Sequence, residues 1–94
     1  MKQDDLIIHF VNGDIQHINK HAGAMHIETD YDADNMTLWS YSVKVAENDL
    51  ESGKITIWGG AIYYSTTTTQ HINKLKDYLY EKEIGYMVNN IHNN

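Results

Sequence analysis

Residues 65–85 read STTTTQHINKLKDYLYEKEIG, and this segment is the most regular part of the chain. Thr67 and Gln70 have the spacing of a capping box, which marks the start of a helix. Apolar residues then recur at helical spacing, at Ile72, Leu75 and Leu79. Gly85 follows as a residue suited to the left-handed position that ends many helices. The sequence predicts a helix over about residues 67–83, with one apolar face that must pack against another layer.

The chain before this helix has the alternation and turn residues of short strands. Two tight hairpins are predicted, Asn12-Gly13 between residues 5–11 and 14–18, and Gly59-Gly60 between residues 54–58 and 61–65. Further strands are expected at residues 24–28, 36–46 and 86–88. The predicted fold is α+β, an antiparallel sheet of about five to seven short strands packed against one C-terminal helix. We expect a single domain over residues 1–94, with residues 89–94 as a frayed tail.

The alternation also predicts which side chains face the core. Met25 and Ile27 share one side of their strand, and Ile55 and Ile57 share one side of theirs. Residues 36–46 read as one half-buried strand, with one face made of Trp39, Tyr41, Val43 and Val45.

From composition we expect a cytoplasmic protein. The 94 residues include no cysteine, which suits a reducing compartment. The apolar run from Leu6 to Phe10 is too short for a signal peptide, and no run approaches the roughly 20 residues of a membrane span. We therefore expect no membrane association.

Charge is distributed unevenly along the sequence. Residues 1–53 hold 10 acids and 3 lysines, a net charge of −7, whereas residues 54–94 hold 3 acids and 4 lysines, a net charge of +1. Acidic chains repel phosphate backbones, which disfavours nucleic acid as a partner. Acidic side chains at Asp30, Asp32 and Asp34 form a surface that suits a basic site on another protein, or they serve solubility alone.

The same aspartates also begin like a calcium loop. Asp30, Asp32 and Asp34 alternate as oxygen ligands would, but the twelfth position of such a loop should be a bidentate Glu and here it is Tyr41. Turns rich in Asp and Asn account for the same residues. We predict no calcium site.

Histidines do not form a metal site either. His17, His21 and His26 are four and five residues apart, and on extended chain they would lie more than about 10 Å from one another. Tetrahedral coordination needs ligands that converge at about 2 Å. Neither a metal nor any other cofactor is predicted.

No hydrolase elbow, phosphate-binding loop, dinucleotide fingerprint or metalloprotease motif is present in the sequence. We predict that the protein is not an enzyme.

Two groups of residues are candidates for binding. The hydroxyl cluster before the helix, with a histidine beside it, would meet an anion at the positive end of the helix dipole, or would simply cap the helix; it comprises Ser65, Thr67, Thr68, Thr69 and His71. Trp58 and Tyr63 lie on the outward face of the second hairpin, where they form an exposed aromatic patch or are covered by other elements.

The segments Trp39-Ser-Tyr-Ser-Val-Lys-Val-Ala46 and Tyr64-Ser-Thr-Thr-Thr-Thr-Gln-His-Ile-Asn73 carry a resemblance. They are similar to a family of small uncharacterised proteins from phages and prophages of Gram-positive bacteria, in which a Tyr-Ser-x-Thr-Thr-Ser-x-His-x-Asn motif precedes a helix. Thr69 replaces the usual Ser of that motif, and Val43 stands where the family usually has Thr. The resemblance covers residues 38–80.

The resemblance implies an origin more than a mechanism. Small phage proteins commonly bind host proteins, so the expected function is a non-enzymatic inhibitor of host defence, similar to an anti-CRISPR protein, in the cytoplasm of the host cell. The alternative is a module that binds a small anion or nucleotide at the Ser65–Thr69 helix start, and a further alternative is binding of nucleic acid. The expected partner is a host protein, and a second copy of the chain is a further candidate because dimers help small domains bury apolar surface.

Overall fold

A computed structural model describes the chain except residues 15–19, 31–33, 60–64 and 91–94. The elements follow in the order α1 (Gln3–Val11), β1 (His21–Ala22), β2 (Met25–Asp30), β3 (Asn35–Ser40), β4 (Val43–Asp49), β5 (Ile55–Gly59), α2 (Thr66–Glu81) and β6 (Tyr86–Asn90). The strands form one sheet in the order β1-β2-β3-β4-β5-β6. Neighbouring strands are antiparallel except β5 and β6, which are parallel and are connected through α2. The predicted α+β class is confirmed.

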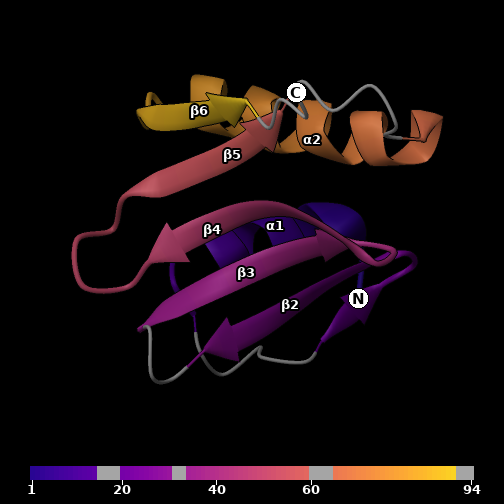
Figure 1. Ribbon diagram of the computed structural model, residues 1–94, viewed down its shortest axis with the longest axis horizontal. Coiled ribbons are helices and arrows are strands. Elements are labelled where there is room, and N and C mark those ends of the chain that lie inside the picture. Colours follow the sequence, from indigo (N-terminus) through magenta and orange to yellow (C-terminus); the bar gives the residue numbers. More distant parts are fainter. Residues whose placement is uncertain (15–19, 31–33, 60–64, 91–94) are drawn as a thin grey trace.

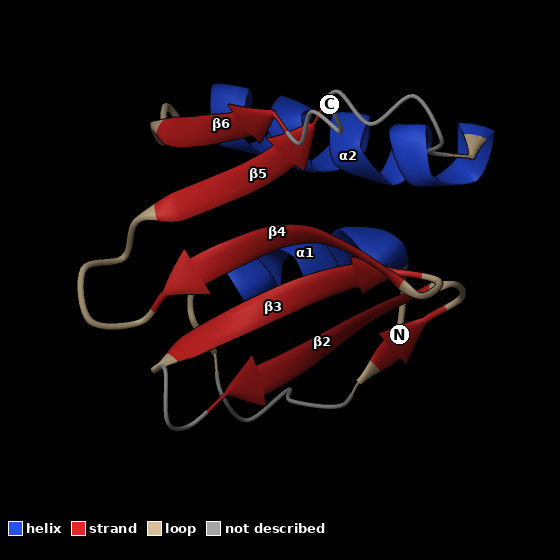
Figure 2. Ribbon diagram, in the orientation of Figure 1, coloured by secondary structure: helices blue, strands red, loops and turns tan. Residues whose placement is uncertain are grey.

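Both helices lie on the same side of the sheet, as Figure 1 shows and as the colours of Figure 2 make clear. Helix α1 packs on β1, β2 and β3, and α2 contacts α1 and β4. The described helices therefore form one layer, and the sheet forms the other. This two-layer arrangement gives the sheet a helical face and an opposite face that neither helix covers.

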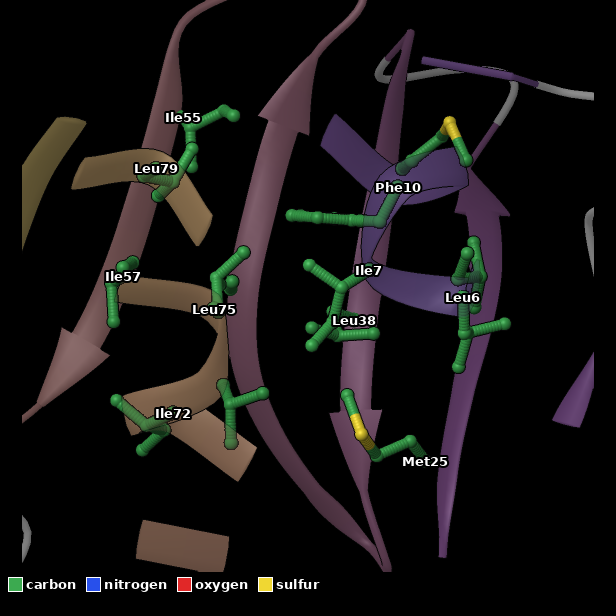
Figure 3. Close-up of a cluster of buried hydrophobic side chains, with 14 of the residues drawn as sticks. Leu6, Ile7, Phe10, Met25, Leu38, Ile55, Ile57, Ile72, Leu75 and Leu79 are labelled. Atoms are coloured by element: carbon green, nitrogen blue, oxygen red, sulfur yellow. The ribbon is translucent and has the colours of Figure 1, made fainter. Parts of the chain in front are cut away.

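The core fills the space between these two layers (Figure 3). Apolar side chains of α1 and α2 are buried against the helical face of the sheet, and they are Leu6, Ile7, Phe10, Ile72, Leu75 and Leu79. The strands contribute the remaining buried side chains, among them Met25, Ile27, Met36, Leu38, Ile55 and Ile57. The predicted inward positions in β2, β5 and α2 are thus confirmed.

The N-terminal segment is helical, so the predicted strand at residues 5–11 and its Asn12-Gly13 hairpin are wrong. Asn12 caps the C-terminus of α1, and Gly13 takes the left-handed conformation with φ of 68°. Gly13 N–H donates to Phe10 O at 3.2 Å and Asp14 N–H to His9 O at 3.0 Å, which together make a Schellman motif. Asn-Gly is equally suited to this motif and to a type I′ turn, so the dipeptide alone could not distinguish them.

The predicted strand at residues 36–46 is also wrong, because two strands and a tight turn occupy it. Ser40 pairs with Val43, and Tyr41 in the turn adopts a left-handed φ of 56°. Neither Tyr41 nor Ser42 is a residue type that predicts such a turn from sequence. The turn is held by a tertiary contact, in which Tyr41 N–H donates to Ala24 O at 2.8 Å. The tertiary contact with the β1–β2 turn thus stabilises a turn that local preference does not favour.

Helix α2 was placed correctly, but its ends differ from the prediction. Its N-cap is Ser65, whose side chain accepts from Thr68 N–H, so the proposed capping box at Thr67 and Gln70 is wrong. At the other end Glu83, not Gly85, takes the left-handed position with φ of 58°. Strand β6 continues to Asn90 and so includes part of the expected tail. The second half of the Gly59-Gly60 hairpin lies outside the described residues, and described β5 pairs with β4 and β6.

Candidate functional site

The sheet face opposite the helices gathers most of the polar and aromatic side chains of the strands. We call it the open face, and among the residues that the strand registers assign to it are His21, His26, Glu28, Thr37, Trp39, Lys44, Glu47, Thr56, Trp58 and Met87. Several of these side chains are half-buried by their neighbours on the sheet. They consequently form a continuous surface across β1 to β6.

One row of the open face consists of rings and a cation. The imidazoles of His21 and His26 stack with centroids 5.1 Å apart, and His26 stacks on Trp39 at 5.9 Å with planes 7° apart. Further along the row, Lys44 Nζ lies 4.8 Å from the centroid of the Trp58 ring. Stacked rings and a cation over an indole are favourable contacts, so this row holds its side chains in fixed positions.

The adjacent row carries carboxylates. Glu28 and Glu47 flank Thr37, since Glu28 pairs with Thr37 and Thr37 pairs with Glu47. Glu28 Oε1 lies 3.4 Å from His26 Nε2, and Glu47 Oε2 lies 3.6 Å from Lys44 Nζ. The carboxylate of Glu28 is about half exposed, with 53% of its side-chain area accessible. It therefore remains available to a cation from outside the chain.

Planar rings beside carboxylates form a recognisable kind of binding surface. A guanidinium group stacks on aromatic rings and pairs with carboxylates in a bidentate manner. A phosphate backbone would meet Glu28 and Glu47 as like charges. The open face is thus chemically suited to an arginine-bearing protein segment.

The hydroxyl cluster at the start of α2 does not present all its side chains to one side. Ser65 Oγ accepts from Thr68 N–H at 3.1 Å and donates to Thr68 Oγ1 at 3.0 Å. Thr68 and His71 are buried, while Thr67 is half-buried and Thr69 is exposed. The side chains that were expected to hold an anion at the helix start are divided between the interior and the surface.

Thr68 and His71 belong to a buried polar network that joins α2 to β3 and α1. Ser40 Oγ on β3 lies 3.0 Å from Thr68 Oγ1 and 2.6 Å from His71 Nδ1. The other ring nitrogen, His71 Nε2, lies 3.2 Å from Gln3 Nε2 on α1. Lys74 Nζ donates to Gln3 Oε1 at 3.1 Å and lies 3.9 Å from Asp4 Oδ1.

The direction of these hydrogen bonds follows from the lysine. Because Lys74 can only donate, Gln3 Oε1 accepts from it and Gln3 Nε2 donates to His71 Nε2. The proton of neutral His71 then resides on Nδ1, which donates to Ser40 Oγ. A serine nucleophile needs the opposite arrangement, in which the imidazole accepts the hydroxyl proton. The fully buried Ser40 hydroxyl therefore does not have the geometry of a nucleophile paired with a base.

The electrostatics of His71 agree with this neutral tautomer. Burial lowers the pKa of His71 below its ordinary 6.5, and the positive charge of Lys74 lowers it further. A protonated ring would also present a second donor to Gln3 Nε2. The network is consequently intact when His71 is neutral.

The remaining predicted site residues are scattered. Trp58 lies on the open face, whereas Tyr63 and Asp32 lie outside the described residues. Asp30 ends β2, and Asp34 is an exposed turn residue directly before β3. Sequence analysis missed Gln3, Ser40 and Glu28. The helical spacing of Thr68 and His71 with Leu75 would have placed these two side chains inward, but nothing in the sequence identifies their partners.

Within the described part of the chain, no group of three or more histidines and carboxylates is arranged to hold a metal ion. Neither described helix combines the length and apolar character needed to cross a bilayer.

Residues 13–88 match the family of unknown function DUF8033. The chain belongs to this family. The DUF8033 match spans β1 to β5, α2 and most of β6, so it includes the strands of the open face. Helix α1 precedes the matched residues, although it supplies Gln3 to the buried network. No curated protein and no solved structure matches the chain.

Proposed function

We propose that this protein is a non-enzymatic binding module whose open face docks onto a basic segment of another protein. The observation that supports it is the pairing of a ring row, His21-His26-Trp39, with the carboxylates of Glu28 and Glu47 on one sheet face. Rings supply rigid contact area, and carboxylates supply charge complementarity to arginine.

The identity of the partner is proposed from the sequence resemblance. We propose that the chain is encoded by a phage or prophage of a Gram-positive bacterium and that its partner is a host protein of a defence system. A net charge of −6 supports docking on a basic protein surface, because the two charges are complementary. Basic surfaces of this kind normally bind nucleic acid. Binding there would inhibit the host protein without chemistry.

A charge-reversal experiment tests the docking face. Tagged wild-type protein, Glu28→Lys and Glu51→Lys are used to capture proteins from a nuclease-treated lysate of the Gram-positive host. Both substitutions raise the net charge from −6 to −4, but Glu51 lies in the exposed turn after β4, away from the open face. We expect Glu28→Lys to reduce capture of the partner at least about tenfold and Glu51→Lys to leave it nearly unchanged.

Two results would contradict the proposal. Equal capture by Glu28→Lys and wild type would exclude the open face, and equal loss with both variants would indicate general charge attraction. The inhibitor role is tested by phage plating on a host strain with active defences. We expect wild-type protein to raise plating efficiency and Glu28→Lys to fail to do so.

A further inference from the structure

The exposed apolar side chains of the described protein gather at one edge of the sheet. Four of the six large ones lie on β6 or on the last turn of α2, namely Tyr80 at 86% exposure, Tyr86 at 37%, Met87 at 54% and Val88 at 47%. Tyr80 and Tyr86 line the same hollow of about 450 Å³, together with Leu79, Ile84, Gly85 and the acidic Glu83. We call Tyr80, Tyr86, Met87 and Val88 the β6 edge patch.

Strand β6 is also the last strand of the sheet. It pairs with β5 on one side, and no other described strand pairs with its second side (Figure 1). Edge strands of soluble proteins are usually protected by charged residues or proline. Residues 86–90 read Tyr-Met-Val-Asn-Asn and contain neither, although the whole chain carries 20 acidic and basic residues.

We propose that β6 pairs antiparallel with β6 of a second copy of this chain, which extends the sheet across a two-fold axis. With Met87 opposite Met87, Tyr86 of each copy lies opposite Val88 of the other, so every apolar residue of the strand meets an apolar residue. The two strands carry no charge, and self-pairing therefore brings no like charges into register. Tyr80 is 86% exposed and lines the same hollow as Tyr86, so we expect it to add contact area beside the paired strands.

The exposed area limits how much apolar surface this dimer can bury. On a scale of roughly 200 Å² for a large apolar side chain, the β6 edge patch exposes about 450 Å² per copy and about 900 Å² over both copies. Stable standard interfaces bury about 1,200–2,000 Å². The main chain of the strands adds to the total, so the expected dimer is weak and depends on protein concentration.

Sedimentation equilibrium tests the pairing with purified protein between roughly 10 and 500 µM, the range suited to a small interface. We expect the wild-type mass to rise from 10.9 kDa toward twice that value. Met87→Lys places two ammonium groups opposite each other and should keep the protein monomeric. Tyr41→Lys changes another exposed apolar side chain, at the β3–β4 turn, and should dimerise like wild type.

A cysteine variant gives a second readout, which does not depend on the charged variant remaining folded. The chain contains no cysteine, so Met87→Cys introduces a single thiol close to its two-fold mate. Mild oxidation should cross-link Met87→Cys at least tenfold faster than Tyr41→Cys at equal concentration. A wild-type mass that stays at 10.9 kDa up to 500 µM, a Met87→Lys dimer, or equal cross-linking of the two cysteine variants would overturn the proposal.

The response to added salt distinguishes this dimer contact from docking of a partner on the open face. Two acidic copies repel each other at long range, so added salt should strengthen the dimer. Docking of a basic partner on Glu28 should weaken under the same change. A dimer that dissociates as salt rises would contradict pairing through the uncharged β6 edge patch.

Discussion

The buried polar network predicts a large loss of stability when Ser40 is replaced by Ala. Ser40 is fully buried, and its hydroxyl contacts both His71 Nδ1 at 2.6 Å and Thr68 Oγ1 at 3.0 Å. Removing the hydroxyl leaves the Nδ1–H donor of His71 without a partner in the interior, which costs about 1–3 kcal/mol. Loss of the bond to Thr68 adds about 1 kcal/mol.

We therefore expect Ser40→Ala to lower the free energy of unfolding by about 2–4 kcal/mol, out of the roughly 5–14 kcal/mol typical of a domain this size. The midpoint of thermal unfolding should fall by about 8–20 °C. Gln3→Ala should cost about 1 kcal/mol or less, because Gln3 is only half-buried and water can reach His71 Nε2 in its place. The two variants thus probe the buried and the exposed ends of one network.

Urea denaturation followed by far-ultraviolet circular dichroism measures both losses. Ser42→Ala is the matched control, since Ser42 is exposed in the adjacent turn and its replacement should change stability by less than about 0.5 kcal/mol. An unchanged urea dependence of the unfolding free energy would show that the compactness of both states is preserved. A loss below about 0.5 kcal/mol for Ser40→Ala, or equal losses for Ser40→Ala and Gln3→Ala, would refute the larger contribution assigned to the buried end of the network.

Two more predictions concern His71 and the end of α2. Burial and the charge of Lys74 lower the pKa of His71, so below about pH 6.5 the unfolded chain binds more protons than the folded one. The free energy of unfolding is therefore highest above that pH. It falls as the pH is lowered, by at most about 1.4 kcal/mol per pH unit. The wild-type decline measured by urea titrations between pH 7.5 and 5 should therefore exceed that of His71→Asn, and parallel declines would contradict it. Glu83 has a left-handed φ of 58° without being glycine, so Glu83→Gly should raise the free energy of unfolding by about 0.5–1 kcal/mol. Glu81→Gly, at the last residue of α2, should instead lower it by about 0.5 kcal/mol or less, and a loss of stability for Glu83→Gly would contradict the prediction.

Sequence alone determined α2 and the inward faces of β2 and β5. The apolar stripe of Ile72, Leu75 and Leu79 has a helical period over many residues, and only one secondary structure places all three on one side. Net charge and the absence of cysteine were likewise complete in the sequence. These features depend on residues that are close together in the chain.

Tertiary structure decided the features that depend on distant contacts. Residues 5–11 contain β-branched side chains and precede Asn12-Gly13, so local preference favoured a hairpin, but as a helix α1 buries Leu6, Ile7 and Phe10 together against the sheet. Asn48 of β4 supports this outcome by donating to Phe10 O at 2.9 Å at the helix end. No local pattern at residues 5–11 encodes that contact.

The candidate sites show the same division. Thr68 and His71 were identified as notable, but their role depended on Ser40, 28 and 31 residues away in sequence, and on Gln3, 68 residues from His71. The open face depended on strand register, because a shift of one residue would turn Trp39 and Glu28 toward the helices. Sequence determined which side chains were present. Which of them are in contact was decided only by strand register and by the packing of both helices on one face of the sheet, because register and burial are set by contacts between distant segments.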